Sequence, residues 1–117
     1  MLGTIGLFVK RFRGAPSSGP RKQLWLLQGG PGFSGADFEP FVRAFTSEVT
    51  NLDVYLPDHR GTGRSSRLGC PQEDPSSPGG FSITPAEWPA CLASVKAQWG
   101  PRLNGFTTTD AARDLDR

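Results

Sequence analysis

The chain has 117 residues and a formal net charge of +2, and its 15 Gly and 11 Pro together make nearly twice their usual share. This length supports one domain at most, and the composition excludes three classes of protein. Collagen is excluded because Gly has no three-residue period, and a coiled coil is excluded because Pro and Gly interrupt every apolar heptad. A membrane span is excluded because no run of about 18 apolar residues occurs.

The pattern of charges and the first residues bear on a nucleic-acid partner and on a signal peptide. The basic clusters are not interleaved with aromatic residues, so we predict no nucleic-acid partner. The apolar stretch Met1–Val9 is followed by Lys10 and Arg11 instead of a small-residue cleavage site, which does not fit a signal peptide.

The first predicted elements are two strands separated by a loop. Residues 4–12 are rich in β-branched and aromatic side chains, as is typical of a strand, and residues 14–20 form a turn or short loop. Residues 22–28 are a nearly continuous apolar run, which predicts a strand buried on both faces. The segment Gly29–Gly35 follows at once and is too rich in Gly to be regular structure.

A helix and a third strand come next. Residues 36–47 predict a helix, because four apolar residues share one of its faces: Phe38, Phe41, Val42 and Phe45. Residues 52–56 predict another buried strand. The order strand, Gly-rich loop, helix, strand predicts parallel pairing and an α/β fold.

The second half of the chain predicts helices and irregular structure. Residues 70–80 are rich in Pro, Gly and Ser. A helix is predicted over residues 84–99 with Thr84 as its N-cap, and another begins with a Thr cap in residues 107–117. We expect residues 70–106 to form an irregular and helical insertion.

The two cysteines flank the irregular stretch. Cys70 and Cys91 are 21 residues apart, with neither metal-ligand spacing nor a companion His. We predict that they form a disulfide, which would favour an extracellular or other oxidising compartment, and two free thiols are the alternative.

The Gly29–Gly35 loop supports several interpretations. A loop with this much Gly between a strand and a helix can present backbone N–H groups to an anion, whereas a plain turn needs one or two Gly. Gly30–Gly35 also matches the dinucleotide motif G-x-G-x-x-G, and Asp53 and Asp58 stand 18 and 23 residues later, near the place of a ribose-binding acid. Against this alternative, Pro31 removes an N–H from the turn that should face the pyrophosphate.

A serine nucleophile in this loop is a weaker interpretation. Ser34 lies in a sequence one residue short of G-x-S-x-G, because Ala36 occupies the place of the last Gly. The single His of the chain, His59, follows 25 residues later, and this order does not match that of a hydrolase triad.

Two motifs together resemble a known family. Gly29-Gly30-Pro31-Gly32, followed by the segment Asp58–Ser65 (DHRGTGRS), resembles the H-G-G-P-G and D-x-R-G-x-G-x-S motifs of the proline iminopeptidase and tripeptidyl aminopeptidase group of α/β-hydrolases. Residues 107–115 resemble the stretch that precedes the nucleophile strand of that family. Gln28 stands where the family usually has His.

The resemblance implies roles for both motifs. It makes the Gly30 N–H the oxyanion donor and makes the other loop residues its frame: Gly29, Pro31, Gly32 and Phe33. It makes the second motif a structural turn held by an Asp–Arg pair, through Asp58, Arg60, Gly61 and Gly63, with no catalytic role for His59. The implied activity is that of a serine hydrolase that removes residues from peptide N-termini, with a peptide or small acyl substrate and no metal or organic cofactor.

The 117 residues do not contain the rest of that machinery. They have no G-x-S-x-G and no late acid or His, so we expect an incomplete α/β-hydrolase domain over residues 1–117 that is inactive by itself. A dinucleotide-binding module and a non-catalytic interaction fragment are the alternative functions.

Overall fold

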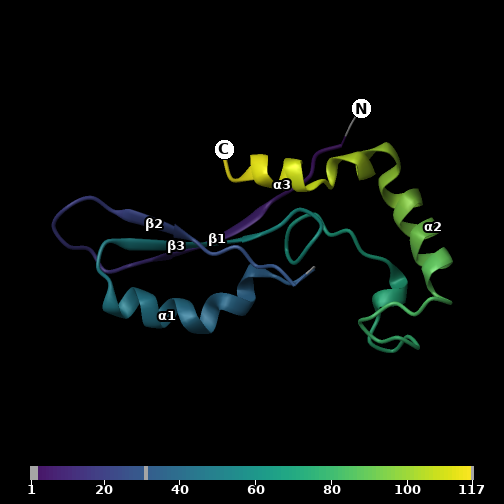
Figure 1. Ribbon diagram of the computed structural model, residues 1–117, viewed down its shortest axis with the longest axis horizontal. Coiled ribbons are helices and arrows are strands. Elements are labelled where there is room, and N and C mark those ends of the chain that lie inside the picture. The colour runs from purple at the N-terminus through teal and green to yellow at the C-terminus, as the bar shows by residue number, and fades with distance from the viewer. Residues whose placement is uncertain (1–2, 31, 117) are drawn as a thin grey trace. The chain divides into compact units, whose positions relative to one another are not determined.

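A computed structural model describes residues 3–30 and 32–116. The chain divides into two compact units, one of residues 5–67 and one formed mainly by residues from 68 onward. Figure 1 shows the elements of both.

The unit of residues 5–67 contains a three-stranded sheet. Its strands are β1 (Phe8–Arg13), β2 (Lys22–Trp25) and β3 (Leu52–Asp58), in the order β1-β3-β2. β2 and β3 are parallel, as predicted, whereas β1 is antiparallel to β3. The general α/β class is therefore confirmed, but the described sheet is mixed and not mostly parallel. β1 and β2 are also shorter than predicted, since β1 starts at Phe8 and β2 ends at Trp25.

Helical structure joins the two parallel strands. A 3-10 turn, η1 (Gly35–Phe38), leads into α1 (Glu39–Glu48), which lies along one side of the strands (Figure 1). Ser34 caps η1 by accepting a hydrogen bond from the Ala36 N–H. Pro40 lies in the first turn of α1, where a missing N–H is tolerated.

The core of this unit lies between α1 and the sheet. Val42 of α1 and Val54 and Leu56 of β3 are fully buried, and five further side chains pack against them: Phe12, Leu24, Leu26, Phe38 and Leu52. The predicted helix face is only partly buried, because Phe41 and Phe45 are 61% and 47% exposed. Val54 and Leu56 alternate with residues of the opposite face, where Trp25 stacks on Tyr55 with ring centroids 4.5 Å apart.

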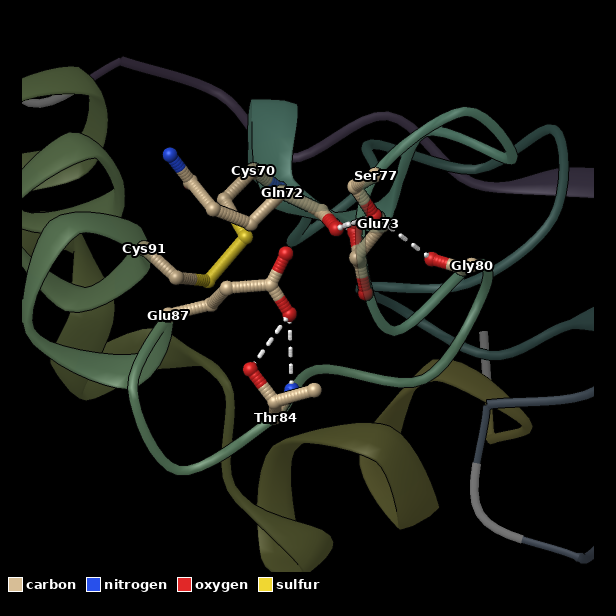
Figure 2. The surroundings of a disulfide bond; sticks show 8 residues. All are labelled: Cys70, Gln72, Glu73, Ser77, Gly80, Thr84, Glu87 and Cys91. Atoms are coloured by element: carbon tan, nitrogen blue, oxygen red, sulfur yellow. Dashed lines mark hydrogen bonds between the residues drawn. A yellow bond between two sulfur atoms is a disulfide. The ribbon is translucent and has the colours of Figure 1, made fainter.

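The second unit has little buried apolar surface. Its elements are η2 (Pro71–Glu73), α2 (Trp88–Trp99), η3 (Gly100–Gly105) and α3 (Thr108–Asp114). Among its described residues, the buried apolar side chains are Cys91 and Trp99. A disulfide joins Cys70, just before η2, to Cys91 of α2 (Figure 2). The structure thus contains the cysteine pairing that the sequence predicted.

The sequence predicted the start of α3 correctly, but it predicted the start of α2 too early. The sequence predicted a Thr cap for α3, and Thr107 supplies it by accepting a hydrogen bond from the Asp110 N–H. The N-cap predicted at Thr84 is wrong, because α2 begins at Trp88. The N–H and the hydroxyl of Thr84 both donate to Oε2 of Glu87, at 2.8 Å each, and this forms a separate turn before the helix (Figure 2).

Candidate functional site

Two loops lie together at one edge of the sheet. Residues 26–34 follow β2, and residues 59–67 follow β3, within the same compact unit. Because β2 and β3 are parallel, their carboxyl ends meet at one edge, where α/β folds place their ligand sites. The two motifs that resemble the hydrolase family are therefore neighbours in space.

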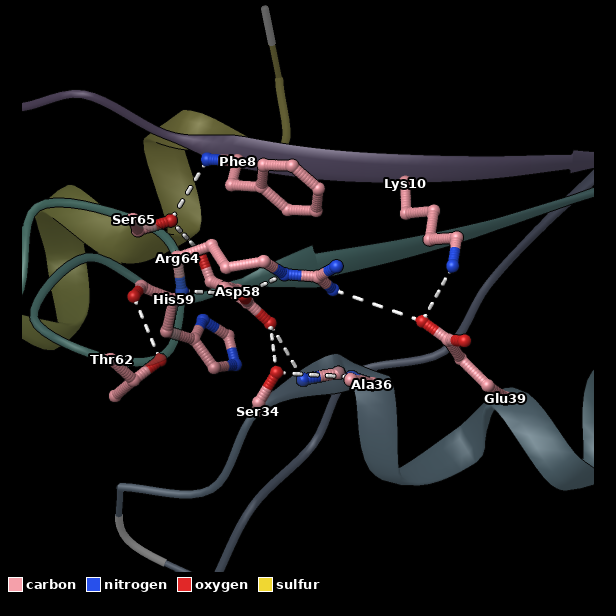
Figure 3. A network of polar contacts seen from close by, with 11 residues as sticks. Phe8, Lys10, Ser34, Ala36, Glu39, Asp58, His59, Thr62, Arg64 and Ser65 are labelled. Carbon is pink, nitrogen blue, oxygen red and sulfur yellow. Dashed lines mark hydrogen bonds and ion pairs between the residues drawn. The ribbon is translucent and has the colours of Figure 1, made fainter.

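Asp58 joins the two loops. Its side chain is buried, and its Oδ1 accepts hydrogen bonds from the Ser34 hydroxyl at 2.7 Å and from the Gly35 N–H at 2.8 Å (Figure 3). Its Oδ2 accepts from the backbone N–H of Arg64 at 2.8 Å and from Nε of Arg64 at 3.3 Å. One carboxylate thus fixes the end of the Gly-rich loop against the second loop.

Arg64 and Ser65 extend this arrangement to β1. The Arg64 guanidinium lies over the Phe8 ring, 3.9 Å from its centroid. The Ser65 hydroxyl accepts from the Phe8 N–H at 2.9 Å and donates to the Asp58 carbonyl (Figure 3). Nε of Arg64 lies 3.3 Å from Oδ2 of Asp58, so the structure shows an Asp–Arg ion pair within the motif for which the sequence predicted one.

The glycines of the second motif allow this close packing. Gly61 has φ +91° and donates its N–H to the Ser66 carbonyl. Gly63 has φ +52°, and a Cβ built there would lie 2.4 Å from Oδ2 of Asp58. A side chain at Gly63 would therefore displace the carboxylate.

We expect Gly63→Ala to destabilise the protein by about 1–3 kcal/mol more than Gly80→Ala, because overpacking against Asp58 adds to the backbone strain. Gly80 is a matched control, since its φ is +60° and nothing lies within 4 Å of a Cβ built there. Urea unfolding of both variants measures the difference. Equal losses of stability would show that the Asp58 contact does not restrict Gly63.

The environment of Asp58 favours its charged form. Burial raises the pKa of Asp58, but hydrogen bonds from the Arg64 N–H, the Ser34 hydroxyl and the Gly35 N–H lower it by more, so it lies below its ordinary value. The pKa of Asp53 is also lowered, first of all by the hydrogen bond from Arg21.

These shifts predict a loss of stability in acid. A carboxylate with a depressed pKa stabilises the folded state above its unfolded value of about 3.9, and this contribution is lost as the pH falls through the folded value. We expect the free energy of unfolding in urea to fall from about pH 5 to about pH 2. The fall should be smaller in Asp58→Asn, and an unfolding free energy that stays constant in the wild type would contradict the prediction.

The Gly-rich loop presents backbone donors. Gly30 and Gly32 have φ of +49° and +99°, and the Phe33 ring covers Gly30, where a Cβ would lie 2.6 Å from the ring. The Gly29 N–H donates to Oε1 of Gln28 at 2.9 Å. Within the described residues, no acceptor is bound to the Gly30 N–H. Pro31, which the sequence placed in this loop, lies outside the described residues.

Ser34 has a structural role in this arrangement. Its hydroxyl donates to Asp58 and accepts from the Ala36 N–H at 3.1 Å. No hydrogen bond joins Ser34 to His59 in the part of the chain that the structure describes. The Ser34 hydroxyl therefore both donates and accepts within the loop structure, and it lacks the contact with a base that activates a nucleophile.

Asp53 and Asp58, the two acids that could bind a ribose in the dinucleotide alternative, are bound to other groups of the protein. Asp53 forms an ion pair with Arg21 and lies at the start of β3, opposite Gln23 of β2. Asp58 lies at the correct edge, but it is buried and bound by the donors described above. Neither carboxylate is available at the Gly-rich loop to bind a ribose hydroxyl.

In the described residues, no group of three or more His, Cys, Asp or Glu side chains could hold a metal ion. No helix in the same residues has the length and apolar character needed to cross a membrane. No protein-family model matches the chain, and no match was found among curated proteins or solved structures.

Proposed function

We propose that this chain supplies the oxyanion-hole loop of an α/β-hydrolase, a serine hydrolase that removes residues from peptide N-termini. The observation that carries the proposal is the Gly30 N–H. It has no acceptor among the described residues, and it belongs to a loop whose end is bound to Asp58 at the carboxyl edge of parallel strands. The two motifs that support the family resemblance therefore meet at one place.

The proposed chemistry is acyl transfer. Attack on an amide or ester carbonyl places negative charge on its oxygen, and an N–H donor held in place stabilises that charge. Loss of one such donor raises the activation free energy by about 3–4 kcal/mol in enzymes of this kind. The nucleophile, its acid and base, and the residue after the nucleophile that supplies the second donor are not among these 117 residues. The preference for peptide N-termini rests on the family resemblance alone.

Titration with an anion tests the oxyanion loop. We expect methylphosphonate, a tetrahedral anion, to shift the Gly30 amide resonance in ¹⁵N spectra more than any other amide, because its N–H is available. Sodium chloride at equal ionic strength controls for screening of the net charge of +2. A Gly30 resonance that does not respond would contradict the proposal, as would equal shifts at unrelated amides.

Two further measurements test the hydrolase assignment. A fluorophosphonate probe should label no serine of the 117-residue chain, because the Ser34 hydroxyl is bound to Asp58 and Ala36 and, within the described residues, no hydrogen bond joins it to His59. A longer protein that contains this segment should carry a strand followed by G-x-S-x-G after it, and a longer protein without that motif would overturn the assignment. Thermal protection by NAD or ATP would instead favour the dinucleotide-binding alternative.

A further inference from the structure

The side chain of Gln28 bridges the Gly-rich loop and the following helical turn. Its Oε1 accepts from the Gly29 N–H at 2.9 Å, and its Nε2 donates to Oδ2 of Asp37 in η1 at 3.2 Å. A glutamine amide has one oxygen that accepts and one nitrogen that donates, so only one orientation of the amide satisfies both partners. The two contacts therefore fix the side chain of Gln28 and the start of the loop together.

The contact with Gln28 makes the N–H groups of Gly29 and Gly30 different. Gly29 and Gly30 are both exposed glycines at the start of the loop. Gln28 occupies the N–H of Gly29, whereas the N–H of Gly30 has no acceptor among the described residues. A bound anion would otherwise have two neighbouring donors available.

We infer that Gln28 is a positioning residue that occupies the Gly29 N–H and thereby selects the Gly30 N–H as the donor to an oxyanion. This inference rests on the proposed function, because it concerns the same loop. The neutral amide also places a donor against the Asp37 carboxylate without adding a negative charge near the anion site. A glutamate could accept from Gly29, but it could not donate to Asp37, and its charge would oppose an anion.

Two variants of Gln28 test two effects separately. One removes the oxygen that accepts from Gly29, and the other adds a negative charge. In Gln28→Ala, we expect the Gly29 amide to exchange with water about fivefold faster, the factor that corresponds to about 1 kcal/mol for one hydrogen bond. Methylphosphonate should then shift both Gly29 and Gly30, instead of Gly30 alone. In Gln28→Glu, the Gly29 amide should exchange no faster than in the wild type, while the response of Gly30 to methylphosphonate weakens. Gln23→Ala on β2 is the matched control and should leave both readouts unchanged.

The results distinguish this inference from the proposed function. If Gly30 responds in the wild type but Gln28→Ala changes neither the Gly29 exchange nor the set of responding amides, the role of Gln28 is overturned and the oxyanion loop stands. If Gly30 does not respond in the wild type, the oxyanion proposal fails and the selecting role of Gln28 fails with it. Faster Gly29 exchange together with a two-amide response in Gln28→Ala supports both.

Discussion

Replacing Asp58 by asparagine is expected to lower the free energy of unfolding by about 3 kcal/mol, the upper end of the usual cost of leaving buried donors without their acceptor. The buried carboxylate of Asp58 accepts four hydrogen bonds, from groups of Ser34, Gly35 and Arg64. An asparagine amide keeps one accepting oxygen and turns an NH₂ group toward donors that already face the site. Donors on one side would therefore lose their acceptor inside the protein.

Urea unfolding of the full 117-residue chain measures this effect. Asp116→Asn is the matched control, because it removes the same charge from an exposed residue, and we expect a change of at most about 0.5 kcal/mol there. Hydrogen exchange adds a local readout, since the Gly35 N–H bound to Asp58 should lose its protection. If Asp58→Asn unfolded at the same urea concentration as Asp116→Asn, the two loops would not depend on this carboxylate.

Removing the disulfide is expected to destabilise the second unit by about 3 kcal/mol, the loop-entropy value for a cross-link between residues about 21 apart. This unit has little else to order residues 71–90, because its buried apolar side chains among the described residues are Cys91 and Trp99. The polar contacts in this stretch are local, such as the bond from the Cys70 N–H to Glu73 and those from Thr84 to Glu87 (Figure 2). We expect the double variant Cys70→Ser/Cys91→Ser to lose order there.

Hydrogen exchange followed by mass spectrometry tests this expectation by region. Amides of residues 71–91 should exchange faster in the double variant and in the reduced wild type, while amides of β3 keep their protection. The intact wild type should yield alkylatable thiols only after reduction. Thiols that are already alkylatable in the native protein would contradict the pairing, and unchanged exchange in the double variant would contradict its stabilising role.

Local sequence patterns predicted many of the elements. The apolar run of residues 22–28, the glycines after it and the helical spacing from Phe38 to Phe45 indicated the strand–loop–helix–strand unit that the structure contains. The three threonines at residues 107–109 likewise indicated the start of α3, and Thr107 is the cap, because an N-cap depends on atoms three residues away. These features follow from interactions between residues close in sequence.

Features that depend on distant residues could not be predicted in this way. The antiparallel pairing of β1 with β3, which makes the sheet mixed, joins residues that are 40 to 50 positions apart in the chain, and strand composition does not encode direction. The exposure of Phe41 and Phe45 depends on how much of α1 the three strands cover. The N-cap expected at Thr84 failed because Glu87 binds both of its polar groups in a separate turn.

The sequence by itself determined that a Gly-rich loop lies between a strand and a helix, and that a second motif follows the next strand. Only the tertiary structure decided how they meet, with Asp58 binding Ser34 and Gly35 across 24 and 23 residues of chain. It also decided that Gln28 binds Gly29 and Asp37 at once. The physical reason is that backbone periodicity is set by neighbouring residues, whereas the partner of a polar group depends on which loops the parallel strands bring to one edge.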